Sequence, residues 1–306
     1  MVESSTAPKS DGAQTGSDAA PHLGLGLLFV VLWATGFVAA RGQAPHGEPL
    51  SFLAVRFFFV IVLFAIISIA LGVRLRVGRQ AFSRNIVTGI LMQGIYLGGI
   101  FWAVDRGMPA AVSALIASLS PLMTAILAGP MLGETVHRRQ WLGLVLGVLG
   151  VGVTVWPNLG ASGFTLMPLM VAFISAAAFS LGSIYQRLHA SQTDIRAANT
   201  IQFMGGLAVV AVAAGMLEPL YLPTALQWWA TLAWAVLVLS LGAVTLLIYM
   251  LRTGAVSKAS ALLFLVPGVA ALMTWPLFGE ALSPVQMIGF AITMLAVALA
   301  TGKRAT

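Results

Sequence analysis

The side chains that could carry proton, metal or nucleophilic chemistry are few in this sequence. The 306 residues include nine acidic residues, four histidines and no cysteine. A buried proton relay, metal site or hydrolytic centre needs such groups gathered inside the apolar stretches, whereas here they stand at the ends of these stretches or in loops. The H-E-x-x-H and G-x-S-x-G patterns are also missing. We therefore expect no enzymatic activity, no metal and no cofactor.

Two glutamates close a motif that the chain contains twice. Pro121 opens PLMTAILAGPMLGE and Pro267 opens PGVAALMTWPLFGE, each with a second proline nine residues later and then Gly-Glu. A proline inside a helix removes a backbone hydrogen bond and kinks the helix, so we predict that Pro121 and Pro267 act as hinges. For Glu134 and Glu280 we predict a role in gating or coupling. The alternative is that each glutamate caps the following helix.

Arg56 is the basic residue that lies clearly inside an apolar stretch, about 10 Å from its end at roughly 1.5 Å per residue. Charges at such depth are costly and usually face a cavity or a partner. We predict that Arg56 binds a substrate carboxylate or pairs with Glu280. The alternative is that its long stem lets the guanidinium reach the headgroup region. Ser118 and Ser120 are expected to satisfy backbone carbonyls freed at the first proline.

Aromatic and small polar side chains within the apolar stretches are candidates for a substrate-binding pocket. Such a lining is mostly apolar with a few hydrogen-bonding groups and suits a small amphiphilic molecule. Besides Arg56, the candidates are Trp33, Thr35, Gln93, Tyr96, Trp102, Ser118, Ser180, Tyr185, Tyr249, Phe264 and Trp275. Four other tryptophans stand at the ends of stretches and are predicted to be interfacial anchors: Trp141, Trp156, Trp228 and Trp229.

The elements that hold these residues are predicted from composition to be transmembrane helices. The chain is 59% hydrophobic and 8% charged, with a mean hydropathy of +0.97, whereas soluble domains carry about 25% charged residues. Apolar stretches of helix-spanning length predict ten spans, near 22–41, 49–72, 85–104, 108–130, 139–157, 164–187, 195–217, 228–250, 254–277 and 283–302. Residues 1–21 are polar and small, which predicts a disordered tail.

The positive charges indicate how the chain faces the membrane. With a cytoplasmic N-terminus, all the basic residues except Arg41, Arg56 and Arg106 fall in cytoplasmic loops or tails, as the positive-inside rule requires. Both termini are then cytoplasmic. Because topology explains the net charge of +7, we expect no nucleic-acid partner.

The twin motif belongs to a repeat that extends over most of the chain. An offset of 146 residues pairs Pro with Pro and Glu with Glu, and it also pairs Gly36 with Gly182, Arg41 with Arg187, Phe57 with Phe203 and Gln140 with Gln286. We therefore predict two five-helix repeats, 22–157 and 164–302. An odd number of crossings places the second repeat upside down relative to the first. Inverted repeats are typical of secondary transporters with a site near the bilayer midplane.

At this point the sequence resembles a known family. W-x-x-G-F (Trp33, Gly36, Phe37), P-L-x-F-L-x-x-R-F (49–57) and the twin motif are similar to those of EamA-type members of the drug/metabolite transporter superfamily. The resemblance implies an all-α ten-helix transporter of the bacterial inner membrane, which exports amino acids or other small metabolites. It also implies that the fifth and tenth spans are peripheral. We expect a monomer in the lipid bilayer with a small-molecule substrate; a passive channel or an integral-membrane enzyme are the alternatives.

Overall fold

The computed structural model describes residues 19–72, 77–133, 135–158, 165–189, 193–219, 221–243, 246 and 265–301. Within these ranges the secondary structure is entirely helical, with no strand. The helices of the first half are α1 (Ala19–Gln43), α2 (Pro49–Ala70), α3 (Arg79–Gly89), η1 (Ile90–Ile95), α4 (Tyr96–Asp105), α5 (Ala110–Ala117), α6 (Ser120–Leu132), α7 (Arg138–Val155) and η2 (Trp156–Asn158). Those of the second half are α8 (Leu166–Leu188), α9 (Ile195–Leu217), α10 (Leu226–Trp234), η3 (Ala235–Gly242), α13 (Val266–Phe278) and α14 (Pro284–Thr301).

The apolar helices are long enough to cross a membrane. Among the described residues, six helical segments have the length and composition of membrane spans, and three shorter apolar helices accompany them. The protein is therefore a multi-pass, all-helical membrane protein. The end of the predicted eighth span and the first part of the predicted ninth, including Tyr249 and Phe264, lie outside the described residues.

Elements of the two halves begin and end at equivalent positions. Shifting α7 by 146 residues gives the bounds of α14. The same shift places the π-helical segment η1 within the π-helical segment η3. The two copies of the proline motif also share their caps. Leu119 before α6 has φ −76° and ψ −13°, and Leu265 before α13 has φ −76° and ψ −16°. Gly133 and Gly279 end these helices in the left-handed conformation, with φ 69° and 70°, which glycine adopts without strain.

Equivalent helices α7 and α14 pack directly on each other and run antiparallel. The hydroxyl of Thr293 donates to the carbonyl oxygen of Gly147, its own equivalent, at 3.2 Å. A Cβ built on Gly143, near the start of α7, would meet Ala300 near the end of α14. One built on Gly289, near the start of α14, would meet Thr154 near the end of α7. Glycines thus let two helices of opposite direction approach closely.

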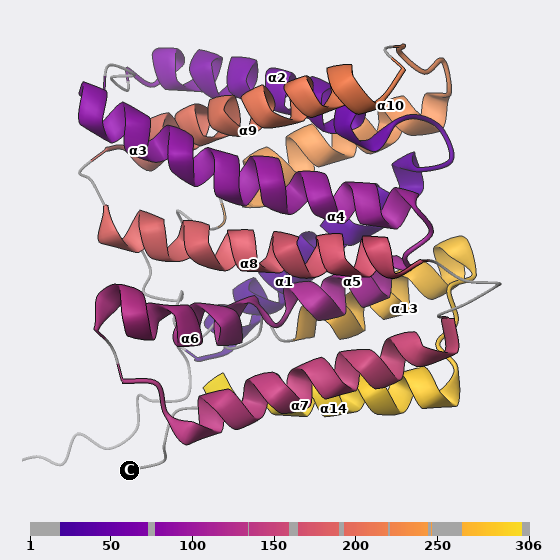
Figure 1. Ribbon diagram of the computed structural model, residues 1–306. Helices are drawn as coiled ribbons and strands as arrows, with labels where there is room; N and C mark the ends of the chain where they lie inside the picture. The colour runs from indigo at the N-terminus through magenta and orange to yellow at the C-terminus, as the bar shows by residue number, and fades with distance from the viewer. Residues whose placement is uncertain are drawn as a thin grey trace, which may run out of the picture.

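Helices α2 and α9 form a second such pair. The rings of Phe57 and Phe203, again equivalent residues, are 5.3 Å apart. Leu50 and Ser51 at the start of α2 bind Glu218, which follows the end of α9, so these helices are antiparallel too. In Figure 1, α2 and α9 lie along one edge of the molecule and α7 and α14 along the opposite edge. At both edges, equivalent residues of the two halves contact each other. An approximate twofold axis through the molecule produces contacts of this kind.

The first proline of the motif follows a break in the helix. We expected a kink in one continuous span, but α5 ends at Ala117 and α6 begins at Ser120. The Ser118 hydroxyl donates to the carbonyl oxygen of Leu115 at 2.6 Å, and not to that of Ala117, the carbonyl four residues before Pro121. The Ser120 hydroxyl instead reaches the carbonyl oxygen of Ala176 on α8 at 3.4 Å. The break therefore joins α6 to a helix of the second half.

Tertiary packing buries one of the four tryptophans predicted to be interfacial anchors. Trp141 and Trp156 are exposed, as residues at the membrane interface should be. Trp228 is 1% exposed, and its ring lies edge-on to Phe52 with the centroids 5.3 Å apart. The prediction of an anchor at Trp228 is wrong, because its ring is buried against Phe52 of α2.

Candidate functional site

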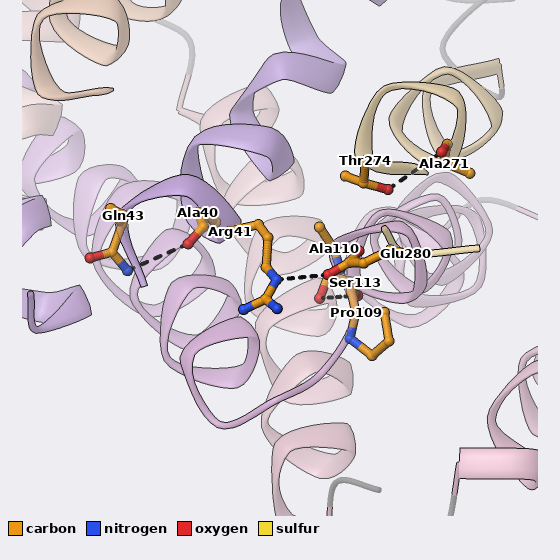
Figure 2. Close-up of polar contacts among 9 residues, drawn as sticks. All are labelled: Ala40, Arg41, Gln43, Pro109, Ala110, Ser113, Ala271, Thr274 and Glu280. Carbon is orange, nitrogen blue, oxygen red and sulfur yellow. Dashed lines mark hydrogen bonds and ion pairs between the residues drawn. The ribbon is translucent and has the colours of Figure 1, made fainter. Parts of the chain in front are cut away.

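Glu280 joins three helices at one end of the molecule. The left-handed turn at Gly279 ends α13, and Glu280 follows it. Its Oε1 lies 2.8 Å from Nε of Arg41 near the end of α1, and its Oε2 accepts from the N–H of Ala110, the first residue of α5, at 3.1 Å. The Glu280 side chain is 14% exposed. We call these three residues the Glu280 cluster; Figure 2 shows them together.

Neighbouring polar side chains do not compete for this carboxylate in the contacts that the structure describes. The Gln43 amide donates to the carbonyl oxygen of Ala40 at 3.5 Å, the Ser113 hydroxyl to Pro109 at 3.3 Å and the Thr274 hydroxyl to Ala271 at 3.4 Å, each a local contact of its own segment (Figure 2). Gln43, Ser113 and Thr274 are all fully buried. At this end of the molecule, the contact between the two halves that involves charged side chains is therefore the Glu280 cluster.

Two sequence predictions for Glu280 are corrected by this geometry. Glu280 does not cap the helix that follows it, because the start of α14 is capped by Gln286, whose Oε1 accepts from the Ser283 N–H at 2.8 Å. It caps α5, from the other half of the chain. Nor does Glu280 pair with Arg56, since its partner is Arg41. Glu134, the equivalent of Glu280, lies outside the described residues.

Glu218 makes a second carboxylate contact between the halves. Its oxygens accept from the backbone N–H groups of Leu50 and Ser51, each at 2.8 Å, and from the Ser51 hydroxyl at 2.9 Å. The first N–H groups of a helix have no partner within the helix. Glu218 therefore caps α2 from the end of α9. Its equivalent is Gly72, so the first half has no carboxylate at the matching position.

Replacing Glu218 with alanine is expected to destabilise the protein by about 1 kcal/mol, the usual cost of losing an N-terminal cap. Thermal unfolding of the purified protein in detergent measures this loss. Glu48→Ala is the matched control, because Glu48 precedes α2 without a capping side-chain hydrogen bond. Equal melting temperatures for the two variants would contradict the capping role.

Arg56 is buried inside the helix bundle. Its residue exposure is 6%, so the alternative that it reaches the headgroups is wrong in this structure. Its Nη2 donates to the hydroxyl of Ser240 in η3 at 3.2 Å, and that hydroxyl donates to the carbonyl oxygen of Ala235 at 3.0 Å. Nε of Arg56 is buried without a hydrogen-bond partner among the described residues. The equivalent Gln202 donates its amide to Asn85 at 3.2 Å.

Three predicted pocket residues, Ser180, Tyr96 and Thr35, make separate contacts between helices. The Ser180 hydroxyl donates to the carbonyl oxygen of Ser120 at 3.0 Å, which ties α8 to the start of α6. Tyr96 is 5% exposed and its ring lies 4.8 Å from that of Phe179. Thr35 accepts a hydrogen bond from Nε1 of Trp234 at 3.2 Å. These contacts connect residues of both halves.

The other predicted pocket residues are more dispersed. Trp33 packs against Phe29 on its own helix, and Gln93 lies in η1 against Gly206. Trp102 carries the guanidinium of Arg106 over its ring at 4.9 Å.

Tyr185 and Trp275 stand apart from the buried contacts. The Tyr185 ring lies 4.2 Å from that of His189, near the end of α8. Trp275 is 61% exposed, among other exposed apolar residues of α13. The predicted set is thus spread over several local groups.

Sequence reasoning missed four residues that make the described polar contacts: Arg41, Asn85, Glu218 and Ser240. One signal was available for Arg41. The offset repeats both members of the Arg41–Glu280 pair, as Arg187 and Glu134, which would be expected if the two charges act together. Within the described residues, no group of three or more histidine, aspartate or glutamate side chains is arranged to hold a metal ion.

One family model matches both halves of the chain. The sequence model of the EamA-like transporter family matches residues 21–156 and again residues 166–302. A probable amino-acid metabolite efflux pump of Escherichia coli is 25% identical over 165 residues, which cover 53% of this chain and 52% of the pump. The chain thus matches about half the length of that relative.

Longer matches have less specific names. The uncharacterized transporter YvbV of Bacillus subtilis is 21% identical, over 90% of this chain and 89% of its own. The uncharacterized inner membrane transporter YedA of Escherichia coli is 21% identical, over 92% of this chain and 90% of its own.

A solved crystal structure has the same fold. It superposes with a TM-score of 0.62 at 21% sequence identity, and the match covers 92% of this chain and 96% of that one.

Proposed function

The chain belongs to the EamA-like transporter family of the drug/metabolite transporter superfamily, and from this premise we propose that it exports small metabolites by alternating access. The substrates are amino acids or related compounds. The name of the Escherichia coli relative, a probable amino-acid metabolite efflux pump, supports this substrate class. So does the mixture of aromatic, hydroxyl and amide groups among the candidate residues.

The observation that carries the proposal is the antiparallel packing of equivalent helices. Phe57 contacts Phe203 between α2 and α9, and Gly147 contacts Thr293 between α7 and α14. Two halves related in this way can exchange conformations, so that a central site opens first to one side and then to the other. We propose ten membrane spans in two inverted repeats, 22–157 and 164–302, with both termini in the cytoplasm.

In this arrangement the Glu280 cluster lies at the outer face. The ends of α1 and α13 and the start of α5 fall there when the N-terminus is cytoplasmic, as the distribution of basic residues favours. Release to the outside requires these ends to separate. We propose that Arg41 and Glu280 hold them together while the cavity is closed to the outside, which assigns Glu280 to gating. Pro121 and Pro267 remain the proposed hinges beneath them.

Counterflow in liposomes tests the function. The full-length protein is reconstituted, the vesicles are loaded with a panel of unlabelled amino acids one at a time, and entry of the same labelled amino acid is followed with and without a pH gradient. A carrier is expected to show saturable uptake that the internal amino acid accelerates several-fold. Counterflow for none of the amino acids and none of their carboxamides would contradict the proposal.

The same experiment distinguishes the alternatives. A passive channel would give flux that does not saturate and is not accelerated from the opposite side. An integral-membrane enzyme would change its substrate chemically, which mass spectrometry of the recovered compound detects. Transporter names among the relatives favour a carrier.

A further inference from the structure

Arg56 carries a buried charge that the described part of the protein does not neutralise. The ion pairs among the described residues join Arg41 to Glu280 and Arg106 to Asp105. Glu218 caps α2. Arg56 itself has Ser240 as its hydrogen-bond partner, through a neutral hydroxyl at 3.2 Å, and its Nε is buried and unpaired among the described residues.

Sequence alone limits where a neutralising carboxylate can come from. The remaining acids stand in the N-terminal tail, at Glu48 before α2, at Glu134 after α6 and at Asp194 before α9. All of these positions are at or beyond the ends of helices, whereas Arg56 lies two turns inside α2. A buried, unpaired charge costs several kcal/mol in a protein interior, and such residues within membrane spans mark substrate pathways.

The equivalent position in the other half shows that the fold does not require a charge there. Gln202 occupies it and is satisfied by a hydrogen bond to Asn85. Both positions immediately precede the phenylalanines, Phe57 and Phe203, that meet each other between the halves. Arg56 therefore lies beside the contact between α2 and α9, close to the approximate twofold axis.

The other partner of Arg56 belongs to an irregular helix. Ser240 lies in the π-helical segment η3, and π-helical turns are frequent at functional sites. Its hydroxyl donates to Ala235 within η3 and accepts from Nη2 of Arg56. This contact fixes one edge of the guanidinium and leaves Nε–H available. A guanidinium can bind a carboxylate through two parallel N–H groups.

We propose that Arg56 is the substrate-recognition residue of this carrier, that it binds the carboxylate of an exported amino acid or related carboxylic acid, and that Ser240 orients it. This inference rests on the proposed function and narrows its substrate class. With Arg56 6% exposed, the structure has this site closed. The carboxylate reaches Arg56 when η3 separates from α2.

The test compares each amino acid with its own carboxamide, which keeps the side chain and the ammonium group but has no carboxylate. Counterflow is measured for the amino acid that wild-type protein exchanges fastest and for the carboxamide of that amino acid. Wild-type protein is expected to prefer the acid. Arg56→Gln is expected to lower exchange of the acid about tenfold or more, the usual effect of losing a hydrogen bond between charged groups, and to leave exchange of the amide unchanged.

Glutamine is the chosen replacement because the second half already holds it at the equivalent position. Size-exclusion profiles in detergent establish that the variant folds. Arg56→Lys is the second variant: it keeps the charge but not the paired N–H groups, so it is expected to raise the KM for the acid and to change kcat little. If Arg56→Gln does not fold, a KM for the acid in Arg56→Lys equal to that of wild-type protein would overturn the proposal.

Three results separate this inference from the function on which it rests. If Arg56→Gln exchanges the acid as wild-type protein does, or loses acid and amide together, Arg56 does not recognise the carboxylate. If wild-type protein exchanges amides but no acids, the carrier function stands and the inference fails. If wild-type protein exchanges neither, the carrier function itself fails and the inference fails with it.

Discussion

Replacing Glu280 with glutamine is expected to open the outer end of the protein. The change removes the charge that Arg41 binds at 2.8 Å but keeps an oxygen for the N–H of Ala110. The Arg41 and Glu280 side chains are 36% and 14% exposed, and an ion pair of this kind contributes about 1 kcal/mol, so the outward-open population should rise roughly fivefold. Arg41→Gln removes the same interaction from the other side and should have the same effect.

Cysteine labelling measures this opening, because the natural sequence has no cysteine. Ser113 lies on α5, one turn below Ala110, and is fully buried. In a Ser113→Cys background, a membrane-impermeant maleimide added outside should react slowly. Adding Glu280→Gln should increase the rate roughly fivefold. The double variant with Arg41→Gln and Glu280→Gln should be labelled about as fast as either single variant, because the effects of two changes within one pair are not additive.

Glu48→Gln is the matched control for the Glu280 experiment. Glu48 is another glutamate at the same face of the proposed topology, and it lies before α2, outside the Glu280 cluster. This control change should leave the labelling rate of the Ser113→Cys protein as it was. Slow labelling with Glu280→Gln, or fast labelling with Glu48→Gln, would show that the Glu280 cluster does not close this end.

Replacing Gly150 with leucine is expected to separate α7 from α14. A Cβ on Gly150 would lie 2.8 Å from both the carbonyl oxygen of Gly289 and the backbone nitrogen of Thr293. Because these are backbone atoms, no side-chain rotation relieves the contact. Overpacking of this kind costs about 3 kcal/mol, and close glycine contacts are what hold such helices together in a membrane.

Thermal unfolding followed by size-exclusion chromatography measures this effect. Gly150→Leu should lower the melting temperature by about 5 °C or more, at roughly 2 °C per kcal/mol for a chain of this size. Gly152→Leu is the matched control on the same helix, because a Cβ on Gly152 would have no atom within 4 Å. Equal melting temperatures for the two variants would contradict close packing of α7 on α14.

The repeat and its family could be found from the sequence because they depend on composition and spacing. Apolar stretches of spanning length predict membrane helices, since a bilayer satisfies no backbone hydrogen bonds. Proline constrains the backbone wherever it stands, and Pro121 and Pro267 both lie in the first turn of a helix, α6 and α13, rather than at a kink in the middle of one. Matching of these residues at one offset identified two copies, and the family comparison confirms them.

Partners between helices could not be found in this way. Glu280 looked like a cap for α14 because that helix follows it in sequence, yet it caps α5. Trp228 looked like an interfacial anchor because it stands at the end of a span, yet α2 buries it. In both cases the deciding neighbour comes from the other half of the chain.

The sequence by itself determined that the chain lies in a membrane, that it is helical, that it contains a repeat and which family it resembles, because each of these depends on residue type and on spacing along one chain. The tertiary structure decided that Arg41 binds Glu280 and that Arg56 meets only Ser240 among the described residues. A charge in a membrane protein is stabilised by whichever group lies within about 4 Å. Packing between helices of the two halves sets those distances.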